Sequence, residues 1–264
     1  MTVTSPGTES GKARRTALSR WLMLWSIVTV VLGVLLAQDG AADTWLFRAT
    51  RWAIGTTEKY SWEKNRLDPA TQPNAAWYRI TPPPFGGKLY KKTETLWRVL
   101  PVMGEFYATI ILAAVAWLYH PRRWRAAVVL LAAAALAGGL GALASAALGR
   151  FRPMAELPSG LLNDGLSIWI PLRGLGFGPG GNLAFPSGHA TLAFATAAAL
   201  AYLSPRGKWL FIVLAGLCAL SRVVLGAHFY ADVICGGALG YTLGWLFAAA
   251  LGRFLGTGNS AGVA

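Results

Sequence analysis

The chain has 264 residues, of which 55% are hydrophobic and only 13% are charged, and it contains twelve tryptophans. A soluble domain cannot cover this much apolar surface with polar side chains, so lipid must be the solvent for much of the chain. The formal net charge is +13, with only eleven acidic residues. This charge favours anionic headgroups or a phosphorylated substrate over cations. Because the basic residues lie between apolar runs and not in one stripe, a nucleic-acid partner is not expected.

A basic, polar tail over residues 1–20 precedes an uncharged apolar run from Trp21 to Ala37. This order is typical of an anchor helix whose tail stays in the cytoplasm. A cleaved signal peptide is the alternative, although the run exceeds the ~7–15 residues of a signal peptide's apolar region. The segment 38–97 is polar and rich in tryptophan. We expect it to lie along the extracytoplasmic membrane interface, where amphipathic rings are favoured, with an ordinary solvated loop as the alternative.

Five further apolar runs have lengths near the ~20 residues that cross a bilayer as a helix. The sequence therefore predicts an all-α, polytopic membrane protein with a bundle of six transmembrane helices. These belong to one membrane domain, residues 21–255, followed by a cytoplasmic tail, residues 256–264. The runs after the anchor cover residues 99–119, 126–148, 188–203, 208–225 and 230–252.

Two short loops, His120–Arg125 and Ser204–Lys208, are basic and lie on the same predicted side as the N-terminal tail. Basic short loops are typical of the cytoplasmic side. The residues from 149 to 186 then face outward, together with the end of the fifth helix and the start of the sixth. We therefore expect a protein of the bacterial inner membrane whose chemically active residues share the periplasmic or exterior face.

Two of the three histidines are placed for chemistry. His189 follows a Pro-Ser-Gly turn at a predicted helix start, where the free amides of Ser187, Gly188 and His189 and the helix dipole favour an anion, above all a phosphate. His228 stands four residues before Asp232. The carboxylate can accept one ring N–H and leave the other nitrogen as a nucleophile or base.

Charged side chains at the same membrane edge complete a predicted phosphate site. Arg150 and Arg152 follow the third span, Arg222 ends the fifth, and Glu105 lies near the outward end of the second. Ionisable groups at a membrane edge are costly unless they are paired or face water, and guanidinium forks bind phosphate well. Each feature alone has a structural explanation, such as an interfacial anchor or a snorkelling carboxylate. Together they favour phosphoryl chemistry, with Glu105 pairing an arginine or contacting the substrate headgroup.

Three segments resemble, in order, the signature motifs of the type 2 phosphatidic acid phosphatase superfamily. They are Gly149-Arg-Phe-Arg-Pro153, Phe185-Pro-Ser-Gly-His189, and Ser221-Arg222 through His228 to Asp232. The resemblance implies that His228 attacks phosphorus, Asp232 orients His228, and His189 protonates the leaving group. It also implies that no metal or other cofactor is required. The phosphate oxygens would be held by Arg152, Arg222, Ser187 and the amide of Gly188.

One position departs from this pattern, because the first motif normally begins with a lysine where this chain has Ser145. Arg150, or a lysine of the long loop (Lys88, Lys91 or Lys92), is expected to supply the missing charge. A degenerate enzyme of low activity or altered substrate is the alternative.

The sequence thus predicts metal-independent hydrolysis of a lipid phosphate or pyrophosphate, with undecaprenyl pyrophosphate as the first candidate substrate. Phosphatidylglycerol phosphate, phosphatidic acid and lipid A phosphates are alternatives, as is a lipid phosphotransferase. The alternative of another class is a non-catalytic lipid-phosphate binder or transporter, although a transporter would place its polar residues near the midplane. A vanadate-dependent haloperoxidase is disfavoured by the membrane spans and by Ser145. The oligomeric state is open.

Overall fold

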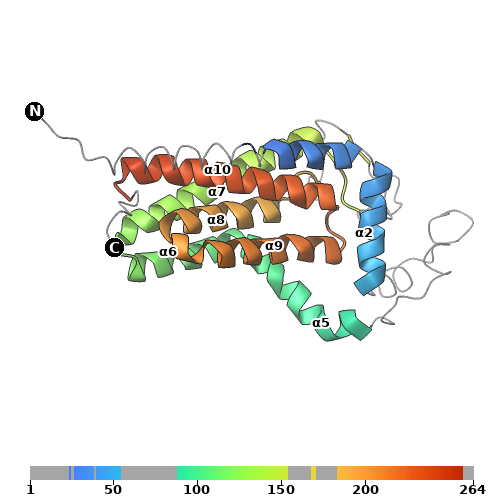
Figure 1. Ribbon diagram of the computed structural model, residues 1–264, viewed down its shortest axis with the longest axis horizontal. Coiled ribbons are helices and arrows are strands. Elements are labelled where there is room, and N and C mark those ends of the chain that lie inside the picture. The colour runs from blue at the N-terminus through green and yellow to red at the C-terminus, as the bar shows by residue number, and fades with distance from the viewer. Residues whose placement is uncertain are drawn as a thin grey trace, which may run out of the picture.

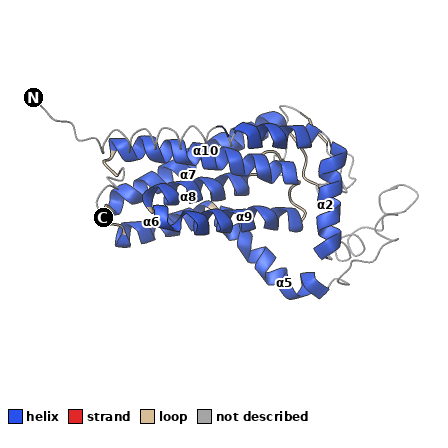
Figure 2. Ribbon diagram, in the orientation of Figure 1, coloured by secondary structure: helices blue, strands red, loops and turns tan. Residues whose placement is uncertain are grey.

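The computed structural model describes residues 24, 27–38, 40–54, 88–153, 168–170 and 183–257. Within these ranges the regular structure is helical, and the extended pairing consists of two isolated bridges in loops (Figure 2). The expected all-α class is confirmed for this part of the chain. The basic tail, residues 1–20, much of the expected interfacial segment, residues 55–87, and residues 258–264 lie outside the described residues.

Five helices form a bundle along the long axis of the molecule (Figure 1). Helix α8 is its interior member, with ten of its sixteen residues buried, and seven of those ten are alanines. Such small side chains let neighbouring helices approach closely. Figure 1 also shows α8 beginning short of the end at which α9 ends and α10 begins. The helices are α6 (Phe106–Tyr119), α7 (Arg123–Leu148), α8 (Gly188–Leu203), α9 (Lys208–Val224) and α10 (Tyr230–Phe254).

A row of glycines fixes the start of α8 against α10. Gly236, Gly240 and Gly244 repeat every fourth residue on α10 and face α8. A Cβ at Gly236 would lie 2.6 Å from the carbonyl oxygen of Ser187, and one at Gly240 would overlap the backbone of Thr191. Only glycine allows this approach of two backbones. The first turns of both helices, which carry the motif residues, are thereby held together.

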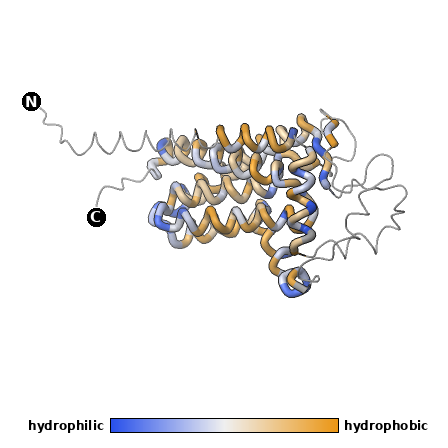
Figure 3. Tube along the Cα trace, turned by 45° about the vertical axis from the view of Figure 1, so that its right-hand side comes forward, coloured by the Kyte–Doolittle hydropathy of each residue, from blue (hydrophilic) through white to orange (hydrophobic). Residues whose placement is uncertain are grey.

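Hydrophobic residues predominate along the middle of the bundle, and hydrophilic residues gather toward its two ends (Figure 3). Three helical stretches are long and apolar enough to cross a membrane: α7, Pro205–Val224 and α10. Up to five spans result if each of two bent helix pairs forms one span. Helix α8 is shorter, at about 24 Å for its sixteen residues, than the ~30 Å hydrocarbon core. The described residues thus support three to five spans, and the six-span count stays a prediction.

The second predicted span, residues 99–119, is not one helix. The stretches Leu89–Gly104 and Phe106–Tyr119 meet at 69°, and Glu105 between them is extended. The first stretch ends in a 3-10 turn, η1 (Leu100–Gly104). A Cβ at Gly104 would lie 2.7 Å from the carbonyl oxygen of His189. Apolar composition predicted this span but could not predict the break, because the break accompanies a tertiary contact with α8.

Helix α2 (Gly40–Ile54) lies across the end of the bundle where α9 ends and α10 begins (Figure 1). The helix before it, Ile27–Gln38, is bent from it by 93°. Arg51 donates to the carbonyl oxygen of Val224 at 2.7 Å, and the hydroxyls of Thr50 and Tyr230 lie 2.8 Å apart. Helix α2 therefore ties together the end of α9 and the start of α10. A further helix, α5 (Lys88–Val99), leads into η1.

Candidate active site

The loop after α7 forms a backbone framework for the site. Gly149 ends α7 with φ 67°, a left-handed conformation that glycine adopts without strain. Its carbonyl oxygen accepts the amide of Ile170 at 2.9 Å, and the carbonyl oxygen of Arg150 accepts the amide of Ala184 at 2.6 Å. The first predicted motif is thus held beside the residues that lead into α8.

His228 is buried, and its Nδ1 lies 2.9 Å from the carbonyl oxygen of Ala184. Because a carbonyl can only accept, Nδ1 carries the proton and Nε2 keeps its lone pair. Asp232 Oδ2 lies 3.6 Å from the same Nδ1, too far for a good hydrogen bond, and accepts the amide of Phe229 at 2.8 Å. Ala184 therefore fixes the tautomer, while Asp232 places negative charge behind the ring. The pairing of His228 with Asp232 was predictable from their spacing, but the carbonyl of Ala184 was not.

Burial lowers the pKa of His228 below its ordinary value of 6.5. Asp232 opposes this shift because its charge favours the imidazolium form, whereas Arg152 and Arg222 add to the shift by repulsion. With a lowered pKa the ring is neutral at pH 7, which is the state that a nucleophile requires.

A tight turn joins Arg222 to His228. Gly226 has φ 77°, and the amides of Ala227 and His228 donate to the carbonyl oxygen of Arg222 at 2.9 and 3.3 Å. The Nε of Arg222 is buried and has no hydrogen-bond partner among the described residues. A buried donor without an acceptor costs free energy. This end of α9 is therefore suited to an anion that accepts from Arg222.

Arg152 is half-buried, and its Nε donates to the carbonyl oxygen of Leu183 at 3.1 Å. The charges of Arg152 and Arg222 repel one another. Two guanidinium groups at interacting distance are stabilised by an anion between them. The structure thus brings together the two arginines that were predicted to bind phosphate.

His189 in the first turn of α8 is paired with Glu105, with its Nε2 2.9 Å from Oε1 of that residue. The side chain of Glu105 is 43% exposed and that of His189 is 23% exposed, against 2% for His228. The charges of Glu105, Arg222 and His228 all act on His189. The two histidines therefore share one site, with His189 on its open side. Glu105 was expected to pair with an arginine or the substrate headgroup; its hydrogen-bond partner is His189.

Ser187 is the N-cap of α8, and its hydroxyl accepts the amide of Ala190 at 3.5 Å. The expectation that the Ser187 amide is free is wrong, because it donates to the carbonyl oxygen of Asp232 at 3.0 Å. Gly188 is exposed, and a Cβ there would meet no atom within 4 Å. As first-turn amides, those of Gly188 and His189 have no acceptor within the helix and can bind an anion.

Arg150 has its guanidinium bound by two buried carboxylates. Its side chain is fully buried, with Nη1 donating to Oδ1 of Asp232 at 2.6 Å and Nη2 donating to Oδ2 of Asp43 at 2.8 Å. The guanidinium carbon lies 4.1 Å from the ring centroid of Phe229. The expected role of Arg150 as a free cation is therefore corrected to that of a buried ion-pair partner. Lys91 and Lys92 are exposed on α5, and the side chain of Lys88 lies outside the described residues.

Asp43 was not among the residues predicted from the sequence. It lies in the first turn of α2, far from the three motifs in the chain, and no motif marks it. The available signal was weak: it is one of only eleven acidic residues, in a segment rich in large apolar side chains.

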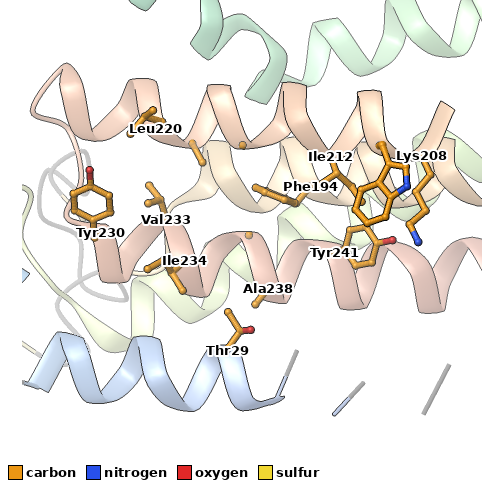
Figure 4. Close-up of a pocket in the computed structure, with 14 residues that line it drawn as sticks. Thr29, Phe194, Lys208, Ile212, Leu220, Tyr230, Val233, Ile234, Ala238 and Tyr241 are labelled. Atoms are coloured by element: carbon orange, nitrogen blue, oxygen red, sulfur yellow. The ribbon is translucent and has the colours of Figure 1, made fainter. Parts of the chain in front are cut away.

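A pocket of about 430 Å³ opens beside His189. It is lined by Glu105, His189 and Gly188, by Phe106 of α6, and by small residues of α7 that include Gly139. A second pocket, of about 530 Å³, lies between the helix Ile27–Gln38, α9 and α10 (Figure 4). Its lining is mostly apolar and includes neither His189 nor His228. The pocket beside His189 is therefore the one that adjoins the candidate catalytic groups.

Comparison with known proteins gave matches in the same part of the chain. The sequence model of the PAP2 superfamily matches residues 126–254, which include all three motifs. A lipid A 1-phosphatase of Rhizobium etli is 48% identical over 61 residues, which are 23% of this chain and 25% of that protein. A decaprenylphosphoryl-5-phosphoribose phosphatase of Mycobacterium tuberculosis is 50% identical over 62 residues, which are 24% of this chain and 34% of that protein.

These matched stretches span between about a quarter and a third of the length of the relatives. No solved structure matches the chain. The region that the family model matches includes both histidines, Asp232 and the two arginines Arg152 and Arg222. Residues 126–254, just under half of the chain, are thus similar to the PAP2 superfamily.

Proposed function

We propose that the protein is a metal-independent phosphatase that hydrolyses a lipid phosphate or pyrophosphate through a phosphohistidine on His228. The observation that carries this proposal is the hydrogen bond from Nδ1 of His228 to the carbonyl oxygen of Ala184. It supports a neutral ring whose Nε2 lone pair is free to attack. A buried structural histidine needs no arginines around it, whereas the charges of Arg152 and Arg222 both act on this ring.

In the first step, Nε2 of His228 attacks phosphorus, and the bond from phosphorus to the leaving oxygen breaks. Protonated His189 donates its proton to that oxygen. In the second step, water attacks the phosphorus, neutral His189 takes up a proton from this water, and the phosphorus–nitrogen bond breaks to release phosphate. Glu105 supports both steps, because its half-exposed carboxylate contacts His189 at 2.9 Å and orients the ring.

The transferring phosphoryl group is held by donors on three sides. Arg152 and Arg222 supply planar forks, and the amide of Gly188 supplies a donor at the positive end of α8. The hydroxyl of Ser187 accepts from the helix as a cap and can still donate its own proton to an oxygen. Charge that develops on the equatorial oxygens is thus met by fixed donors, which is the main source of rate enhancement in phosphoryl transfer.

The lipid tail leaves the site through the pocket beside His189. Its α7 wall includes Gly138 and Gly139 and contains no charged residue. A Cβ at Gly139 would meet no atom within 4 Å, so this wall is open and smooth. Such a wall accepts the hydrocarbon tail of a lipid whatever the headgroup of that lipid. The phosphate end of the lipid then lies at the histidines. Substrate enters sideways from the bilayer.

Undecaprenyl pyrophosphate is the first substrate to test. The named relatives act on lipid A and on a decaprenyl-linked phosphate, so lipid A phosphates and other isoprenoid phosphates belong in the same panel, together with phosphatidylglycerol phosphate and phosphatidic acid. The basic loops His120–Arg125 and Ser204–Lys208 lie at the end of the bundle opposite α2 (Figure 1). By the positive-inside rule, this arrangement supports a site at the periplasmic or exterior face of the inner membrane.

The test is phosphate release by the detergent-purified protein, with chelator present, from this panel, compared between wild type and His228→Ala. Release by the wild type and its loss in the variant support the proposal. Product formed only when a second lipid is added, without free phosphate, indicates a phosphotransferase. Tight binding of a lipid phosphate without turnover indicates a binder or transporter, and it contradicts the proposal.

A further inference from the structure

A buried cluster of charges lies directly behind His228, and it includes a residue outside the three motifs. Arg150, Asp43 and Asp232 are all fully buried. The two terminal nitrogens of Arg150 bond one carboxylate each, at 2.6 Å for Asp232 and 2.8 Å for Asp43. The guanidinium is packed on Phe229 at 4.1 Å and lies 5.2 Å from the ring of Trp169. These aromatic neighbours keep the cluster in a medium of low dielectric constant, where charge interactions are strong.

The second carboxylate changes the charge of the cluster. With both carboxylates ionised, one guanidinium and two carboxylates sum to a formal charge of −1, whereas the pair of Arg150 and Asp232 alone would be neutral. When His228 bonds to phosphorus, its ring becomes cationic, and a negative cluster behind it stabilises that state. The neutral pair would do this less well, because the charge of Arg150 offsets that of Asp232. Asp43 thus determines whether Asp232 acts on His228 as part of a net negative group.

The second carboxylate also fixes the position of the others. Oδ1 of Asp43 accepts the amide of Ala231 at 3.2 Å, in the first turn of α10. Asp232 follows in the same turn, and its Oδ2 caps the amide of Phe229. Asp43 therefore touches both the guanidinium that bonds Asp232 and the backbone that carries Asp232. Asp43 therefore acts on His228 indirectly, through its bond to Arg150 and its bond to the backbone of α10.

We infer that Asp43 is a positioning residue for the nucleophile: through Arg150 it holds Asp232 in place and keeps the cluster behind His228 negative. This inference rests on the proposed phosphatase function. It assigns α2 a role in the reaction, although that helix lies outside the region matched by the family model. Because Asp43 does not contact the substrate site directly, its effect is on the chemical step and not on binding.

The test compares Asp43→Asn with Thr50→Val in the full-length, detergent-purified protein. Both substitutions remove a side-chain bond from α2 to the start of α10, since Thr50 bonds the hydroxyl of Tyr230 at 2.8 Å. Only the first changes the charge of the cluster. We expect Asp43→Asn to lower kcat by about tenfold or more with KM unchanged, and to slow formation of the phosphoenzyme equally. Thr50→Val should leave kcat within about twofold of wild type.

Equal losses in both variants, or a kcat for folded Asp43→Asn within about twofold of wild type, overturn the inference. If Asp43→Asn does not fold, Asp43→Glu and Asp43→Gln replace it, because they match in size and differ only in charge. Higher turnover of the Glu variant supports the inference, and equal turnover overturns it. His228→Ala is measured in the same series. If His228→Ala keeps its turnover, the proposed function and the positioning role are both overturned. If His228→Ala is inactive while Asp43→Asn keeps the turnover of the wild type, only the positioning role is overturned.

Discussion

Replacing Arg222 with alanine should lower turnover strongly while leaving the unliganded protein no less stable. The Nε of this side chain is buried without a hydrogen-bond partner among the described residues. An unsatisfied buried donor costs about 1–3 kcal/mol, and truncation removes that cost. The packing of its methylene groups is lost at the same time, at about 0.8 kcal/mol for each buried CH₂. The two effects are similar in size, so the unfolding temperature should change little.

The effect of the same change on catalysis should be large. A preorganised donor that meets developing charge contributes about 2.7–4 kcal/mol, which corresponds to about 10²–10³ in kcat. Arg222→Lys keeps the charge but loses the planar fork, and it should recover only part of this factor. The assay is release of phosphate from the best lipid of the panel, together with thermal unfolding in detergent with and without added inorganic phosphate or vanadate.

Added anion should raise the unfolding temperature of the wild type and have a smaller effect on Arg222→Ala, because ligand binding stabilises only the state that binds it. Arg206→Ala, which removes a basic residue from η4 (Pro205–Gly207) at the other end of α9, is the matched control and should behave as wild type. The reasoning is refuted if Arg222→Ala unfolds at a much lower temperature without anion and yet keeps kcat/KM within tenfold of wild type.

Three further predictions concern other parts of the site and fold. Glu105→Gln should lower kcat by about 10²-fold, because His189 loses the carboxylate that supports its proton transfer; activity equal to wild type across the pH range would contradict this. Because the pKa of His228 is lowered, the wild type should keep its nucleophile unprotonated as pH falls through 6.5. In the unfolded chain, His228 takes up a proton at a higher pH than in the folded protein. His228 should therefore reduce the stability of the folded protein below pH 6.5, which thermal unfolding would detect in the wild type but not in His228→Ala. Gly240→Ala should destabilise the protein by about 1–3 kcal/mol because its Cβ overlaps the backbone of α8, whereas Gly139→Ala, which meets open space, should not; equal unfolding temperatures would contradict the packing.

The helices that line the site were predictable because their signals are local. Apolar runs gave the bounds of α8 as 188–203, as observed, and those of α7, α9 and α10 to within a few residues. The spacing of His228 and Asp232 and the Ser-Gly turn before His189 depend only on helix geometry. The arginines that flank these turns followed from the cost of a charge at a membrane edge.

The remaining features depend on contacts between distant segments. The break at Glu105 goes with the packing of Gly104 on His189, and the partner of Glu105 is known only once that contact is formed. The tautomer of His228 is fixed by a backbone carbonyl, which no residue type encodes. Arg150 looked like a free cation because its partner Asp43 lies 107 residues away in the sequence. A charge that stands next to a motif is therefore not necessarily part of the phosphate site.

The central claim, a covalent phosphohistidine on His228, is tested most directly by acid-free trapping of the phosphoenzyme. Detergent-purified protein is mixed with a lipid phosphate labelled on phosphorus, quenched within the first turnover, and mapped by mass spectrometry under alkaline conditions. We expect label on His228 in the wild type, more label in His189→Ala if that change slows hydrolysis of the phosphohistidine more than its formation, and none in His228→Ala. Phosphate release by the wild type with no labelled residue, or label that persists in His228→Ala, would contradict the claim.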